Sequence, residues 1–84
     1  MKKYPAIALI ESSSIAIGIL VGNEMLKKAP IAVIKSGTVH NGKYLNLIGG
    51  SVASVEESFK TGLAIGADDV IDSMILPNVH QQLH

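Results

Sequence analysis

The dipeptide Asn41-Gly42 lies between two runs of β-forming residues, and no other stretch constrains the fold as strongly. The first run begins at Ile31, and the second extends from Lys43 to Ile48. Both central residues of a type I′ turn need a positive φ, which asparagine and glycine tolerate best. The sequence therefore predicts a β-hairpin over residues 31–50 with a type I′ turn at its tip.

The tip of this hairpin carries the most unusual chemistry of the chain. A histidine, an amide and a lysine stand close together at His40, Asn41 and Lys43. A histidine beside Asn-Gly is, taken alone, a solvated turn residue. The tip becomes a candidate site only if several copies of the chain bring it together.

Four further elements flank the hairpin. Residues 6–10 form a short apolar run of strand length, and the serines at 12–14 can cap a helix over residues 15–28. Ser51 can cap a second helix with an apolar stripe at 52, 55, 59 and 63, which Gly62 and Gly66 loosen and end. A last strand follows at 70–76, stopped by Pro77. The order β-α-β-β-α-β predicts a ferredoxin-like α+β domain over 1–84, with helices on one face of a four-stranded antiparallel sheet and a polar tail at 78–84.

The chain has more apolar residues than a domain of 84 residues can bury. Apolar residues make up 48% of the chain and charged residues 17%, so association with other copies is expected. The first half of helix 15–28 is apolar almost all round, which predicts packing against its own sheet and against a neighbouring copy. The sheet face opposite the helices is expected to carry Ser, Asn and Ala.

Several classes of function are excluded or disfavoured by composition. The chain has no cysteine, which excludes disulfides, thiolate metal sites and cysteine nucleophiles. All seven basic residues are lysines and the chain has no tryptophan, which argues against nucleic-acid binding. No apolar stretch is long enough for a membrane span, and no signal peptide is visible, so an intracellular protein is expected.

Four weaker candidate sites have simpler explanations. Gly49-Gly50-Ser51 could hold a phosphate, but a turn with a serine cap accounts for it. Asp68, Asp69 and Asp72 lack the further ligands of a calcium loop. His80 and His84 form a two-ligand pair only if the tail is helical, and Glu11 has no histidine within sequence reach. Nothing assembles a nucleophile, a base and an orienting group, so no enzyme is expected.

Five segments, in this order and at these distances, resemble a bacterial microcompartment (BMC) domain, the shell-protein module of carboxysomes and metabolosomes. They cover nearly the whole chain. The segments are AIALIE at 6–11, EMLKKA at 24–29, the glycine-containing hairpin turn, IGGSVASV at 48–55 and ILPNVH at 75–80. The segments GKYL at 42–45 and LPNVH at 76–80 look closest to the domains of the propanediol-utilisation tandem-domain shell protein that carries an iron–sulfur centre.

The resemblance implies an assembly and two sets of site residues. BMC domains pack as cyclic hexamers, or as trimers of tandem chains, and the discs tile with other shell proteins into a shell. In this family the turn between the second and third strands lines the central pore, which implies a pore lined by Val39, His40, Asn41 and Gly42. The resemblance also assigns Lys27 to the disc edge, where a long lysine donates to backbone carbonyls of its symmetry mate.

Two departures from the family pattern matter. Where the iron–sulfur relative has Cys-Pro-Gly-Lys, this chain has His40-Asn41-Gly42-Lys43, so a thiolate-held cluster is excluded and no cofactor is expected. Imidazoles of His40 converging on the axis could still hold a metal. At the disc edge, Asn78 stands where many hexamers have an arginine.

The resemblance implies a non-enzymatic shell protein of a bacterial microcompartment in the cytoplasm, with a pore for passive diffusion of small metabolites. One alternative is a disc that holds a metal or redox centre at its axis through His40. An alternative of another class is a small ferredoxin-like ligand-binding domain.

Overall fold

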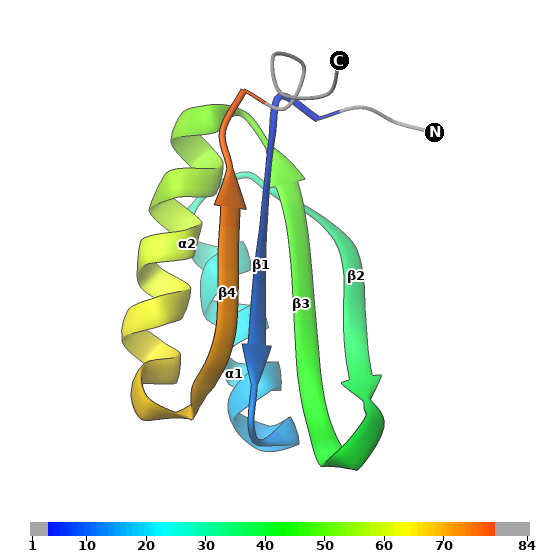
Figure 1. The fold of residues 1–84 in the computed structure, drawn as a ribbon. Coiled ribbons are helices and arrows are strands. Elements are labelled where there is room, and N and C mark those ends of the chain that lie inside the picture. Colours follow the sequence, from blue (N-terminus) through cyan, green and yellow to red (C-terminus); the bar gives the residue numbers. More distant parts are fainter. Residues whose placement is uncertain (1–3, 79–84) are drawn as a thin grey trace.

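The computed structural model describes residues 4–78, which form one α+β domain (Figure 1). The elements in chain order are β1 (Ala6–Ser12), α1 (Ile15–Lys28), β2 (Ala32–Val39), β3 (Lys43–Gly50), α2 (Val52–Gly66) and β4 (Val70–Leu76). Single 3-10 turns at His40–Gly42 and Ala67–Asp69 join β2 to β3 and α2 to β4. The predicted element order is confirmed.

The four strands form one antiparallel sheet in the order β2-β3-β1-β4, with both helices on one face (Figure 1). Each helix begins at a serine cap, as expected: Ser14 Oγ accepts from Ile17 N, and Ser51 Oγ accepts from Ser54 N. The split βαβ fold predicted from the sequence is therefore confirmed.

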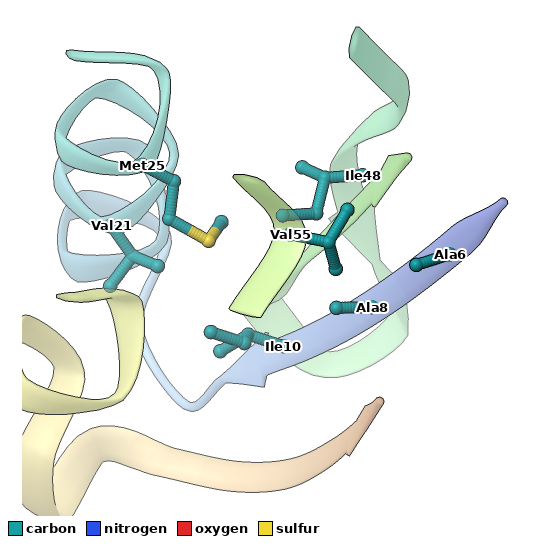
Figure 2. Packing of buried hydrophobic residues seen from close by; sticks show 7 residues of the cluster. All are labelled: Ala6, Ala8, Ile10, Val21, Met25, Ile48 and Val55. Atoms are coloured by element: carbon teal, nitrogen blue, oxygen red, sulfur yellow. The ribbon is translucent and has the colours of Figure 1, made fainter. Parts of the chain in front are cut away.

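The core lies between the sheet and the helices and is built mainly from small and medium residues (Figure 2). Along β1, every second residue from Ala6 to Ser12 is buried, so this face of the strand lies under the helices. The fully buried apolar residues are Ala6, Ala8, Ile10, Val21, Met25, Ile48 and Val55. The predicted stripe of α2 is also confirmed, because Val52, Phe59 and Leu63 pack against this cluster.

Glycines let the helices approach the sheet closely. A Cβ on Gly18 of α1 would lie 2.3 Å from Tyr44 Cβ, and one on Gly62 of α2 would lie 2.6 Å from Ile10 Cδ1. Gly62 is thus a packing position inside α2, and the expectation that it loosens the helix misses this role. Gly66 is the last residue of α2, as expected.

The hairpin is confirmed, but the predicted type I′ turn is wrong. β2 ends at Val39 and β3 begins at Lys43, and these two residues pair with each other. Three residues therefore connect the strands, whereas a type I′ turn has two. Gly42 has a φ of 75°, the positive value that a three-residue hairpin loop requires at its glycine.

The expected composition of the open sheet face is also wrong. Asn46 and Ala8 are buried on the helix side of the sheet. Because side chains alternate along a strand, the open face carries the intervening residues, which are mostly large and aliphatic. On three neighbouring strands this row reads Leu47, Leu9 and Met74, which are direct cross-strand partners.

Candidate functional site

The candidate pore turn is the exposed end of the β2–β3 hairpin. His40 and Gly42 are exposed, and Val39 is half-buried as the last residue of β2. A Cβ built on Gly42 meets nothing within 4 Å, so there is open space beside this glycine. The tip can therefore contact another molecule without rearrangement of the fold.

The candidate pore turn and the candidate disc-edge residues lie toward opposite ends of the domain. The hairpin tip, the β1–α1 connection and the α2–β4 connection share one end (Figure 1). The last turn of α1, with Lys27, and the end of β4, which leads to Asn78, lie toward the other. This separation is what a disc requires if the tip faces the axis and Lys27 faces the rim.

Lys27 extends from the last turn of α1 into solvent. Its side chain is 74% exposed, and Nζ lies 3.4 Å from Glu24 Oε2, one helical turn earlier. An exposed pair of this kind contributes little stability, so Lys27 remains able to exchange this partner for another. The basic end of α1 also suits the negative end of the helix dipole.

Asn78 is exposed and has a φ of 57°, in the left-handed region. Asparagine tolerates this backbone conformation better than most residues other than glycine. The backbone conformation therefore gives a local reason for an asparagine at position 78. The expectation from the family pattern, in which many hexamers have an arginine here, does not include this reason.

Two of the four weaker candidates have structural roles. Gly49 belongs to β3, where a Cβ would lie 2.6 Å from Tyr4 Cγ, and Ser51 Oγ is used as the cap of α2. Asp69 Oδ1 accepts a hydrogen bond of 3.1 Å from Ser13 Oγ, which ties the α2–β4 connection to the start of α1. Glu11 lies on β1, opposite Asp72 of β4. His80 and His84 lie outside the described residues.

Within residues 4–78, no three side chains of the His, Cys, Asp or Glu type come together as a metal site. His40 would therefore need imidazoles from other copies to hold a metal. A cysteine-ligated iron–sulfur cluster does not fit this chain, because the sequence has no cysteine. In the same described part, no helix is long and apolar enough to span a membrane.

The sequence analysis misses a polar chain beside the tip, a row of hydrogen-bonded side chains formed by Tyr44, Ser36 and Asn46. Asn46 is 2% exposed, and its Nδ2 donates a 2.8 Å hydrogen bond to the carbonyl oxygen of Gly18 in α1. Ser36 Oγ lies 3.2 Å from Asn46 Oδ1 and 2.8 Å from Tyr44 Oη. In the sequence, the signal for this arrangement is Asn46 itself, a polar residue among the apolar residues of the 43–48 run. Its hydrogen-bond partner, Gly18, is 28 residues away along the chain.

Large apolar side chains are exposed on several elements of the described residues, and α1 carries the largest group of them. On α1, Gly18, Val21 and Met25 face the core, while four large aliphatic residues are exposed, namely Ile15, Ile19, Leu20 and Leu26. The other exposed large apolar residues lie on β2, α2 and β4, namely Val33, Ile34, Ile65, Ile71 and Met74. Large apolar surfaces of this kind mark interaction sites, which agrees with the expectation that α1 packs on two sides.

Comparison with known proteins identifies the class of protein that this fold and turn define. The model of the BMC domain matches residues 6–79, and the chain therefore belongs to the BMC-domain family. The resemblance noted in the sequence is confirmed.

Two relatives make the comparison more specific. The chain is 40% identical over 75 residues to the bacterial microcompartment shell protein PduT of Citrobacter freundii, covering 89% of this chain and 41% of PduT. PduT is the tandem-domain shell protein expected from residues 42–45 and 76–80.

A solved structure also resembles this chain in fold and sequence. A microcompartment protein from Desulfitobacterium hafniense DCB superimposes with a TM-score of 0.85 at 44% identity, over 92% of this chain and 43% of that chain. The chain thus spans less than half the length of both relatives.

Proposed function

We propose that this chain is a structural, non-enzymatic shell protein of a bacterial microcompartment, located in the cytoplasm. The observation that carries the proposal is membership of the BMC-domain family together with 40% identity to a shell protein over 75 residues. The exposed aliphatic residues of α1 and the exposed Met74 of the open sheet face support it, because they supply the apolar surface that self-assembly requires. Its partners are further copies of the chain and other shell proteins.

The proposed assembly is a cyclic hexamer whose central pore is lined by Val39, His40, Asn41 and Gly42 of each copy. Support comes from the exposed tip and from its position at the end of the domain away from Lys27. In this assembly the backbone groups of the turn and the imidazole of His40 offer hydrogen bonds to small polar metabolites that diffuse through. Lys27 and Asn78 lie at the rim, where discs meet.

The absence of native cysteine allows a direct test of the pore. The variant His40→Cys places one thiol at each tip, and a short bis-maleimide reagent should link copies within the particle. With one thiol per copy, the expected product is a covalent dimer whose yield does not change on dilution. Glu57→Cys, at an exposed position on α2, is the matched control and should give far less product. Equal, dilution-sensitive linking of both variants would contradict convergence of the tips.

The alternative that His40 holds a metal at the axis stays a prediction. It requires the same ring, because the described residues of one chain hold no set of three ligands. Titration of the particle with Zn²⁺ by calorimetry separates the two functions. Binding that is lost in His40→Ala would favour a metal centre, and equal heats in both proteins would favour a pore without metal.

A further inference from the structure

Of the two strands that carry the candidate pore turn, β3 pairs with β1 along its length, whereas β2 has β3 as its one strand neighbour in the described sheet. β2 is an edge strand, and four consecutive residues from Val33 to Ser36 are exposed. Among the described residues of β2, Ser36 is the one whose side chain hydrogen-bonds to other side chains. The contacts of Ser36 therefore bear directly on where the tip lies.

The hydrogen bonds around Ser36 have a fixed direction. The carbonyl of Gly18 can only accept, so the atom of Asn46 that contacts it is Nδ2, and Oδ1 is left facing Ser36. Ser36 Oγ then uses its single proton to donate to Asn46 Oδ1. Tyr44 must therefore donate to Ser36 Oγ. The chain of donors runs from Tyr44 through Ser36 to Asn46, and Asn46 in turn donates to α1.

The glycine face of α1 makes this arrangement possible. A Cβ on Gly18 would lie 2.3 Å from Tyr44 Cβ, and one on Gly22 would lie 2.6 Å from Asn46 Oδ1. Tyr44 is the second residue of β3 after the turn and pairs with Thr38, which precedes Val39. One end of the polar chain thus sits beside the tip, and the other is buried against α1.

We propose that Tyr44, Ser36 and Asn46 are positioning residues that hold the β2–β3 tip in place relative to α1, and so set the position of the pore turn. The part of this inference that concerns the pore rests on the proposed function, because a fixed tip sets the width and chemistry of a pore only in the assembled ring. The hydrogen bonds themselves concern a single chain. They can therefore be tested apart from the assembly.

The test is amide hydrogen exchange in the full chain, followed at His40, Gly42 and Lys43 and compared with Ile10 and Ile48 in the core. Tyr44→Phe removes one hydroxyl and keeps the ring packed on Gly18. We expect several-fold faster exchange at the tip and unchanged exchange in the core. Tyr4→Phe is the matched control, since it removes the other tyrosine hydroxyl of the chain, and should leave the tip unchanged.

A double-mutant cycle tests the chain of donors itself. Ser36→Ala breaks both of its bonds, so we expect a larger rise in tip exchange than with Tyr44→Phe. Tyr44→Phe should then add nothing in the Ser36→Ala background, because its acceptor has gone. Unchanged tip exchange, additive effects, or faster exchange spread evenly over the core would each overturn the proposal. Failure of the copies to form a ring would instead overturn the proposed function and leave these exchange rates interpretable.

Discussion

The two faces of the sheet differ in the size of the residues they carry. The face under the helices mixes small residues such as Ala8 with the larger Ile10 and Ile48, and glycines of both helices approach it closely. The open face carries large aliphatic residues such as Leu9 and Met74. A domain that depended on its own core alone would be expected to place its largest apolar residues inside.

This difference explains how a small chain can be both folded and associative. Close packing of small residues brings the helices near the sheet, and Ile10, Met25 and Ile48 fill the remaining space. The aliphatic residues left outside gain little from folding of one copy. They become buried when a second copy covers them. The face under the helices therefore stabilises folding of the single chain, and the open face stabilises association between copies.

Neighbouring residues on β1 give the sharpest contrast. Ile10 is buried among the core residues, and Ile10→Ala should lower the free energy of unfolding by about 2–4 kcal/mol. Leu9→Ala, one residue earlier on the open face, should cost much less in a single copy and should instead reduce the mass of the particle. Urea denaturation and light scattering measure the two effects. Equal losses of unfolding free energy would remove the distinction between the faces.

Glycine substitutions test the close approach under the helices. Gly18→Ala places a Cβ 2.3 Å from Tyr44 Cβ, an atom held near the backbone, so overpacking should destabilise the domain by about 1–3 kcal/mol or more. At Gly37 of β2 a Cβ meets nothing within 4 Å. Gly37→Ala should therefore leave the thermal unfolding midpoint almost unchanged, and a comparable drop in both variants would contradict the packing described.

Two buried serines should respond with opposite signs. Ser58 Oγ donates a 3.0 Å hydrogen bond to the Met25 carbonyl, and Ser58→Ala should cost about 1 kcal/mol. Ser12 Oγ is buried and has no hydrogen-bond partner among residues 4–78. Ser12→Ala should be neutral or stabilising by up to about 1 kcal/mol, since an unpaired buried hydroxyl is costly. Chemical denaturation of both variants measures the difference, and a loss at Ser12 equal to that at Ser58 would show that its hydroxyl has a partner.

Local signals in the sequence were sufficient for the order of the elements. Serine caps at 14 and 51 mark the helix starts, and apolar periodicity separates helices from strands. The exact turn was not predictable, because Asn-Gly suits a two-residue loop and a three-residue loop alike. The choice of the buried sheet face was missed because alternation along β3 distinguishes two faces without showing which one the helices cover.

Long-range contacts were the least predictable part of the candidate site. The burial of Asn46 depends on Gly18, which is distant in sequence, and nothing local indicates the bond. The pore and rim assignments of His40 and Lys27 came from family resemblance. The fold places them toward opposite ends of the domain, but their roles depend on an assembly that no single chain contains.

The mass of the particle in solution tests the central claim most directly. If the uncovered apolar surfaces close a ring, size-exclusion chromatography with light scattering will give a mass six times that of the 84-residue chain, constant over a wide range of concentration. A monodisperse species with the mass of one chain at every concentration would contradict the account.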